Sequence, residues 1–366
     1  MSVMTTGPLI SAAKPLEFAC GALMKNRFML APLTNCQSHA DGQLSDDEFR
    51  WLTKRAEGGF GLTMTCAAHV QRAGQGFPGQ LGIYSDHLLD GHRRLASAIQ
   101  SHGSLAVVQL HHAGMRSPSS LIGEAPVAPS ADEETGAREL ELGEVHALRD
   151  DFIAAAVRCE QAGYDGVEIH GAHGYILCQF LSPLHNRRKD AYGGSLENRM
   201  RLVLEILEGV RQACGARFLL GLRLSPERFG MDVEECMKMS QGFIDSGHLD
   251  FLDLSLWDCF KAPEDETHRN KTLLEHVSGL RRQHVQLTVA GKISSARDVK
   301  RILDAGIDFV TIGRSGILHH NFPERVITDP DFEPVSLPVS ADYLRSEGLG
   351  EAFVQYMSRW KNFVTP

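Results

Sequence analysis

Several features that would place a protein outside the ordinary globular class are missing from this sequence. None of its eight cysteines forms a C-x-x-C pair, so neither a zinc site nor an iron–sulfur cluster is predicted. No apolar run approaches the roughly 18–20 residues that a membrane-spanning helix needs. Residues 1–14 lack the basic start and apolar core of a secretion signal. Unpaired thiols are typical of a reducing compartment, and we therefore expect a cytoplasmic protein.

The sequence also contains fewer basic residues than acidic ones. The chain carries 37 Lys and Arg residues against 46 Asp and Glu residues, a formal net charge of −9. An acidic chain is poorly suited to nucleic acid and to anionic membranes, so we expect neither as a partner. The composition, 43% hydrophobic and 23% charged, is that of a globular protein with a substantial core. We expect a small-molecule partner, and a homo-oligomer is compatible with the sequence.

One unit does recur along the chain: an amphipathic helix, a glycine, a short gap and then an apolar strand. Gly163 and Gly306 each end one such helix a few residues before a strand. Glycine suits the left-handed residue that ends a helix, and buried parallel strands have the length and apolar content of these runs. The eight predicted strands are 27–32, 61–65, 105–110, 166–170, 218–224, 251–255, 285–290 and 309–313.

Eight alternations of strand and helix predict an α/β protein whose parallel sheet closes into a (β/α)8 TIM barrel. An open, doubly wound sheet is the alternative. We predict a single domain over 1–366, with the barrel core at about 26–318 and a C-terminal extension at 319–366. Residues 15–26 are predicted to form an N-terminal hairpin that caps the barrel, and 115–145 a long irregular loop after the third strand.

Capping signals predict where some helices begin. Ser45 followed by Glu48 indicates a capping box. Ser195 after a pair of glycines indicates a turn into a capped helix, which explains that segment structurally without any function. Residues 318–349 are expected to be irregular, and 350–362 to form a final helix.

Small and cationic residues follow the last two predicted strands. The active site of such a barrel lies at the carboxyl ends of its strands, and the loops after strands seven and eight often hold a phosphate group. Gly291 and Gly313 allow a close backbone approach, and Arg314 adds a forked cationic donor set. The alternative is that both glycines are only turn residues. His111 and Trp257 also lie near strand ends, where packing explains them as well as function does.

His170, His173 and Tyr175 form the sharpest local feature of the sequence. The spacing His-x-x-His-x-Tyr, on a loop after a strand, can direct two imidazoles and a phenol into one pocket. Two imidazole N–H groups can polarise a carbonyl or nitro oxygen, and the phenol can deliver a proton. A metal site is less favoured, because no third ligand is near and the spacing is not helical. A purely structural histidine pair is the other alternative.

These stretches together resemble the Old Yellow Enzyme family of flavin oxidoreductases. The resemblance covers roughly 16–322 and rests on motifs that occur in order at compatible spacing. The motifs are Asn26-Arg27 to Ala31-Pro32-Leu33-Thr34, Gln109-Leu110-x-His112-Ala113-Gly114-x-Arg116, Glu168-Ile169-His170 to Tyr175, Phe180-Leu181-Ser182-Pro183, Tyr192-Gly193-Gly194-Ser195 with Asn198-Arg199, and Gly313-Arg314.

The resemblance implies a non-covalently bound FMN, with NADPH or NADH as the hydride donor. It implies that the Thr34 hydroxyl lies near the reactive edge of the flavin and tunes its reduction potential, and that Arg223 faces the N1/O2 side. The other flavin contacts that it implies are Pro32, Leu33, Ala67, Gln109 and, around the phosphate, Gly291, Lys292, Gly313 and Arg314.

The resemblance also implies an enzyme, an NAD(P)H:flavin oxidoreductase that reduces activated C=C bonds of enones, enals and nitroalkenes by ping-pong hydride transfer. His170 and His173 would bind the oxygen of the substrate, and Tyr175 would donate the proton. Cys36 stands where some bacterial members have tyrosine, which leaves the substrate contacts of that loop open. Two alternatives are a flavin-free phosphate-binding barrel of the aldolase or isomerase type, with Lys292 as the Schiff-base candidate, and a non-catalytic flavin-binding scaffold.

Overall fold

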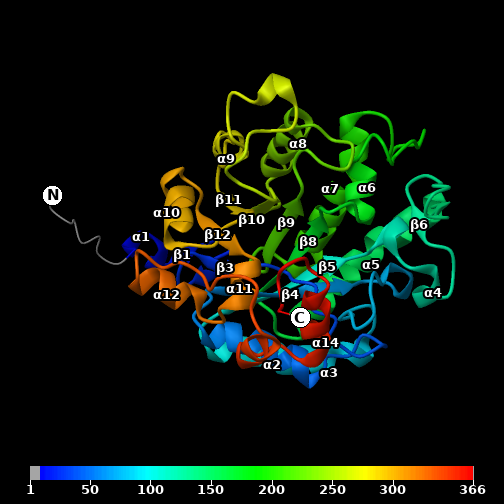
Figure 1. The fold of residues 1–366 in the computed structure, drawn as a ribbon. Helices are drawn as coiled ribbons and strands as arrows, with labels where there is room; N and C mark the ends of the chain where they lie inside the picture. The colour runs from blue at the N-terminus through cyan, green and yellow to red at the C-terminus, as the bar shows by residue number, and fades with distance from the viewer. Residues whose placement is uncertain (1–8, 366) are drawn as a thin grey trace.

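The computed structural model describes residues 9–365, so residues 1–8 and 366 of the predicted single domain lie outside the described range. Eight parallel strands close into a barrel in the order β10-β11-β12-β3-β4-β5-β8-β9 (Figure 1). The predicted (β/α)8 TIM barrel is therefore confirmed, and the open sheet is wrong. The barrel strands are β3 (Phe28–Leu30), β4 (Leu62–His69), β5 (Leu105–His111), β8 (Gly166–Gly171), β9 (Leu219–Leu224), β10 (Phe251–Ser255), β11 (Gln286–Ala290) and β12 (Phe309–Ile312).

All eight strands lie where the apolar runs predict them, and only β4 is clearly longer than expected. It continues to His69 because its register against β5 shifts between Met64 and Ala67, after which pairing resumes. Such a bulge bends a strand and re-aims its side chains near a site.

Helices separate the strands and cover the outside of the barrel (Figure 1). In α10, Ala296, Val299 and Ile302 are buried at spacings of three residues, which presents one apolar face to the sheet. The longer helices are α2 (Asp46–Glu57), α3 (Leu89–Ser101), α5 (Leu142–Gln161), α7 (Leu196–Cys214), α8 (Val233–Asp245) and α10 (Ala296–Asp304). The shorter ones between strands are α4 (Ser119–Ile122), α6 (Ile176–Leu181), α9 (Leu273–Ser278) and α11 (Arg314–Leu318).

The amino-terminal end of the barrel is closed by a hairpin, as the sequence predicts. β1 (Leu16–Glu17) and β2 (Leu23–Met24) pair antiparallel, and Gly21 makes the turn with a φ of 89°. The ring of Phe18 lies 5.9 Å from that of Phe251 and 5.8 Å from that of Phe309, centroid to centroid. The hairpin therefore inserts an aromatic plug into the bottom of the barrel.

The capping box predicted at Ser45 is only half present. The Ser45 hydroxyl accepts a hydrogen bond from the Glu48 N–H at the start of α2. The Glu48 side chain does not return this bond, because it is fully buried and bonded to Asn35 at 3.0 Å and to Ser38. The prediction of a reciprocal box is wrong, and Glu48 instead ties α2 to the loop after β3.

Two segments expected to be irregular contain regular structure. Within 115–145 lie α4, the two-stranded sheet of β6 (Val127–Ala128) and β7 (Arg138–Glu139), and the start of α5. The final helix predicted at 350–362 is present as α14 (Glu351–Ser358). Within 318–349 lie α12 (Phe322–Thr328) and α13 (Ala341–Ser346), and α1 (Ile10–Ala13) precedes the hairpin. Elements this short carry too few residues for a periodic pattern to appear in the sequence.

The C-terminal extension packs back on the barrel. Phe353 in α14 meets Trp51 in α2 with ring centroids 4.9 Å apart, and Figure 1 shows α14 beside the α2 and α3 region. Among residues 9–365, no helix combines the length and apolar character required to cross a bilayer.

Candidate active site

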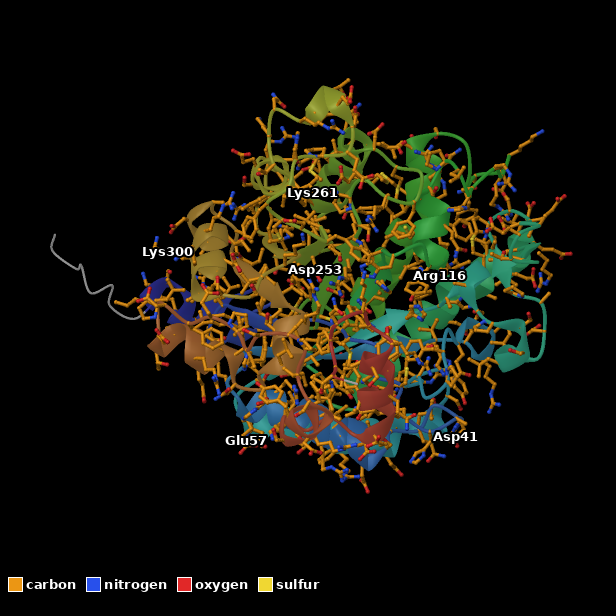
Figure 2. The ribbon with its side chains drawn as sticks, viewed as in Figure 1. Asp41, Glu57, Arg116, Asp253, Lys261 and Lys300 are labelled. Carbon is orange, nitrogen blue, oxygen red and sulfur yellow. The ribbon has the colours of Figure 1, made fainter. Side chains whose placement is uncertain are left out.

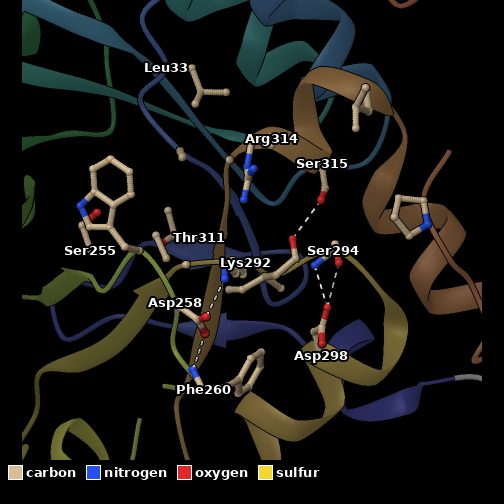
Figure 3. A pocket seen from close by; sticks show the side chains of 18 of the residues that line it. Leu33, Ser255, Asp258, Phe260, Lys292, Ser294, Asp298, Thr311, Arg314 and Ser315 are labelled. Atoms are coloured by element: carbon tan, nitrogen blue, oxygen red, sulfur yellow. Dashed lines mark hydrogen bonds and ion pairs between the residues drawn. The ribbon is translucent and has the colours of Figure 1, made fainter. Parts of the chain in front are cut away.

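The carboxyl ends of the strands open into a cavity of about 1150 Å³. Parallel strands end at one rim of a barrel, so residues far apart in sequence meet there. The cavity is larger than a typical pocket for a drug-sized ligand, and so has room for an extended one. Its walls include Leu33, Ser255, Thr311 and Arg314, drawn from both ends of the chain (Figure 3).

His170, His173 and Tyr175 lie together at the end of β8, and His173 is the member of this group that lines the cavity. His170 lies in β8, and His173 follows in a left-handed conformation with a φ of 60°. The His170 ring centroid is 5.1 Å from that of His173 and 5.3 Å from that of Tyr175. The Arg116 guanidinium donates to the His173 carbonyl and lies 4.8 Å from the Tyr175 ring centroid. The two imidazoles and the phenol therefore form one cluster, and a cation braces it.

Burial makes both imidazoles neutral near pH 7. Desolvation, followed by the neighbouring histidines, lowers the pKa of His170 well below its usual range. Desolvation, followed by Arg223, does the same for His173. A neutral imidazole has one N–H donor and one acceptor. His173 Nε2 is 2.9 Å from Ser255 Oγ, whereas within the described residues His170 Nδ1 is buried with no partner.

A buried polar network occupies the barrel below this cluster. Gln109 donates to Glu168 at 2.7 Å, and Arg223 Nε lies 3.0 Å from Asp253 Oδ2. Desolvation, reinforced by the charge of Asp253, raises the pKa of Glu168 to about 8, and desolvation also raises the pKa of Asp253. The Thr311 hydroxyl lies 3.3 Å from Asp253, which sits near the middle of the molecule (Figure 2). Arg223 thus pairs with Asp253, and its charge also acts on the buried carboxyl group of Glu168.

The residues predicted to contact a flavin ring fall into two groups. Pro32 and Leu33 line the cavity, whereas Thr34, Ala67 and Gln109 are not among its lining residues. Ala67 pairs with Gln109 across β4 and β5. Gln109 is buried and its amide is already bonded to a carboxyl group.

The residues predicted to hold a phosphate all line the same cavity, and so does Arg223. A Cβ on Gly291 would lie 2.9 Å from the carbonyl carbon of Trp257, so only glycine fits there. Nothing lies closer than 4.0 Å to the corresponding position on Gly313, which leaves its backbone open. Arg314 follows directly at the start of α11. An apolar wall, a buried guanidinium and an open cationic end together fit a phosphorylated heteroaromatic ring such as FMN.

Lys292 is poorly placed to form a Schiff base. Its ammonium pairs with Asp258 at 2.8 Å, and its side chain is 60% exposed (Figure 3). A nucleophilic lysine needs desolvation or a neighbouring cation instead. The site therefore does not support the aldolase alternative.

Sequence reasoning gave no role to several residues of the site. Glu168 and Asp253 each interrupt an apolar strand, which is a sequence signal of a functional interior. Leu337 and Trp360, from the C-terminal extension, also line the cavity. No pattern in the sequence indicates their position, because it depends on how the extension folds back over the rim.

Comparisons with known proteins define the class of this enzyme. The model of the NADH:flavin oxidoreductase / NADH oxidase family matches residues 13–330. A probable NADH-dependent flavin oxidoreductase of Bacillus subtilis is 35% identical over 324 residues, covering 86% of this chain and 87% of that protein. Some other relatives are much longer, and the chain spans only 33 to 48% of three of them.

Solved structures agree with the family match. An Old Yellow Enzyme homologue from Zymomonas mobilis superposes with a TM-score of 0.78 at 26% identity, covering 94% of this chain and 99% of that one. A morphinone reductase variant in complex with tetrahydroNAD gives a TM-score of 0.77 at 26% identity, covering 94% and 97%.

The chain belongs to the Old Yellow Enzyme family of NADH:flavin oxidoreductases. It is an oxidoreductase that uses FMN and a nicotinamide hydride donor. The predicted family, enzyme class and cofactors are confirmed, and the aldolase-type barrel and the non-catalytic scaffold are wrong.

Proposed function

We propose that this enzyme reduces activated C=C bonds, in enones, enals and nitroalkenes, with Tyr175 as the proton donor. The observation that carries the proposal is the cluster of His170, His173 and Tyr175 at the end of β8, of which His173 lines the cavity. Two hydrogen-bond donors and one acid suit a substrate with an electron-withdrawing oxygen and a carbon to be protonated.

The two histidines bind the carbonyl or nitro oxygen. Both rings are neutral, so each offers one N–H without the cost of burying a charge. Ser255, 2.9 Å from His173 Nε2, fixes the orientation of that ring. Hydrogen bonds to the oxygen withdraw electron density from the alkene, which favours hydride addition at Cβ.

Tyr175 protonates Cα. Within the described residues no hydrogen bond occupies its hydroxyl, and the Arg116 guanidinium packs 4.8 Å from the centre of its ring, which helps to hold the phenol in place. The His111 ring, centred 4.4 Å away and nearly perpendicular, holds the phenol ring in position.

FMN, when bound, supplies the hydride transfer by accepting hydride from the nicotinamide donor in one half-reaction and giving it to the alkene in the next, a ping-pong sequence. Arg223, which lines the cavity, would hold the N1/O2 side of the flavin, and the Thr34 hydroxyl would tune its reduction potential. Pro32 and Leu33 would contact the ring, with Ala67 and Gln109 on its polar side, and the phosphate would be held by Gly291, Lys292, Gly313 and Arg314.

Small-molecule acceptors and a reducing compartment complete the proposal. All eight cysteines are free thiols, which supports a location in the cytoplasm.

Tyr175→Phe tests the proton donor. The variant should retain FMN and be reduced by NADPH at the wild-type rate, but reduce 2-cyclohexenone about 100-fold more slowly, because only proton transfer is lost. Stopped-flow absorbance measures the two half-reactions separately. A nitroalkene should be less affected, since water can protonate its nitronate product.

Tyr84→Phe is the matched control. The Tyr84 hydroxyl donates to the Asp41 carbonyl at 2.8 Å and is not part of the cluster of Tyr175 and the two histidines, so both half-reactions should be unchanged. Equal rates of cyclohexenone reduction for Tyr175→Phe and wild type would remove Tyr175 from the mechanism.

A further inference from the structure

An exposed tryptophan and an arginine form a flat surface on the cavity wall, beside the histidine cluster of the proposed reaction. The Arg228 guanidinium carbon lies 4.3 Å from the centre of the Trp257 ring. Both residues line the cavity, and Trp257 is 56% exposed. We call this pair the Trp257–Arg228 shelf.

The shelf is built from backbone conformations that ordinary residues avoid. Trp257 has a φ of 60°, and Glu227 and Phe229, on either side of Arg228, have φ values of 54° and 59°. A bulky residue in this region is strained, and such strain persists only where the surroundings impose it. Here Gly291 packs directly against the carbonyl carbon of Trp257. Strain that exposes an indole instead of burying it indicates a surface kept for binding.

Charge points to an anionic ligand. Two other cations line this part of the cavity, and both are neutralised: Lys261 by Glu227 at 2.7 Å and Lys292 by Asp258 at 2.8 Å. Within residues 9–365, Arg228 has no carboxylate partner within ion-pairing distance. A free guanidinium beside an aromatic face suits a ligand that combines phosphate with a flat ring.

We infer that the Trp257–Arg228 shelf binds the adenosine diphosphate half of NADPH or NADH. The Trp257 indole stacks on the adenosine, and Arg228 pairs with a phosphate. The same cavity reaches His173, so one extended dinucleotide spans from the shelf to the reacting end of the site. Coenzyme A carries the same chemistry, but the hydride donor must enter this cavity in every turnover. The inference rests on one part of the proposed function, that the hydride donor enters this cavity. It does not depend on the role of Tyr175 or on the identity of the alkene.

Hydride donors that share the nicotinamide ring but differ in the rest of the molecule test this role. NADPH and NADH carry adenosine diphosphate, whereas 1-benzyl-1,4-dihydronicotinamide does not. Arg228→Gln removes the charge, and Trp257→Gly removes the indole while suiting the left-handed backbone. In each variant the KM for NADPH and for NADH should rise about tenfold, because each substitution removes one favourable contact. The kcat should not change. The KM for the benzyl donor should not change.

Arg94→Gln is a matched control, because Arg94 stacks on Phe49 at 3.9 Å outside the cavity. Its kinetic constants should equal those of wild type with either donor. Fluorescence titration should show unchanged FMN affinity in all three variants.

Other results would overturn the inference. An equal rise in KM for all donors, or unchanged values for NADPH and NADH, would show that the shelf does not read adenosine diphosphate. Weaker FMN binding in the variants would assign the shelf to the flavin. A rise in KM only for the alkene substrate, including an alkene that carries a coenzyme A thioester, would assign the shelf to the acceptor. Failure of every donor to reduce the wild-type flavin would instead refute the proposed function.

Discussion

The two ends of the barrel interior differ completely, although the same strands build both. At the amino-terminal end the interior is apolar and closed by the hairpin. At the carboxyl-terminal end it contains charged groups and opens into the cavity. The apolar end consists of Phe18, Met29, Leu62, Met64, Val107, Leu219, Phe251 and Phe309. The polar end includes Gln109, Glu168, Arg223, Asp253, Thr288 and Thr311, all buried.

The alternation of side chains along a strand explains how one strand serves both ends. In β10, Phe251, Asp253 and Ser255 are two residues apart and so face the same side, the barrel interior. The first belongs to the aromatic plug, the second to the buried charge network and the third contacts His173. The apolar layer at the amino-terminal end therefore stabilises the barrel, whereas the polar layer at the carboxyl-terminal end contains buried charges that serve the chemistry of the site.

The largest loss of stability should come from the apolar end. Phe251→Ala removes a fully buried ring that packs on Phe18 and Phe309, and should lower the free energy of unfolding by about 4 kcal/mol. Chemical denaturation measures it. Leu23→Ala, at an exposed hairpin residue, should change it by less than about 0.5 kcal/mol. Similar values for the two variants would mean that the plug does not stabilise the barrel.

At the polar end, Arg223→Met should lower the free energy of unfolding by about 3 kcal/mol, because it leaves the buried Asp253 without its ion-pair partner. FMN affinity, measured by fluorescence titration, should fall as well. Lys300→Met breaks an ion pair with Asp304 whose two side chains are 59% and 60% exposed, and should have almost no effect. A fully stable Arg223→Met that binds FMN normally would contradict the account of this layer.

Substitutions at the two ends of the barrel should affect the pH dependence of the protein's stability differently. The folded pKa of Glu168, about 8, exceeds the ordinary 4.5, so between these values the unfolded chain binds fewer protons and stability falls as pH rises. The lowered pKa values of His170 and His173 act in the opposite direction, but only below about 6.5. From pH 7 to 8 the urea midpoint should therefore fall in wild type and fall less in Glu168→Gln.

The control for this prediction is Phe251→Ala, which should shift the urea midpoint by the same amount at pH 7 and pH 8, because no titrating group is involved. Parallel pH profiles of wild type and Glu168→Gln would refute the raised pKa of Glu168.

The smallest effect should come from the hairpin turn. Gly21 has a φ of 89°, and no atom lies within 4 Å of where a Cβ would stand. Gly21→Ala should therefore cost only the backbone strain, about 1 kcal/mol, measured as a small fall in the melting temperature. Gly143→Ala also meets no atom, but Gly143 lies in α5 without a positive φ, so it should be neutral or slightly stabilising. Equal losses in both variants would argue against strain.

The barrel could be read from the sequence because long-range closure depends on local patterns repeated eight times. Apolar runs mark every barrel strand, four of them after a helix-ending glycine, and Gly21 marks the hairpin. The sequence could not predict the partners of the Glu48 side chain. Its carboxylate bonds to Asn35 and Ser38 in the interior and not to the N-terminus of its own helix. Short helices such as α12 and α13 were not predicted either, because so few residues show no helical periodicity of apolar positions.

The residues of the site likewise include some that the sequence could predict and some that it could not. The triad of His170, His173 and Tyr175 is local in sequence, so its spacing indicates a common direction. The pairing of Arg223 with Asp253 requires knowledge of which strands are neighbours, β9 and β10, and of their register. The position of Trp360 in the cavity wall depends on tertiary packing alone.

The most direct test of the central claim is an anaerobic absorbance titration of the purified protein. The account predicts the yellow band of bound flavin, its bleaching by NADPH, and its return when 2-cyclohexenone is added without oxygen. A band that bleaches but is not restored by enones, enals or nitroalkenes would contradict alkene reduction at the polar end of the barrel. A protein that neither contains nor takes up FMN would contradict the cofactor site itself.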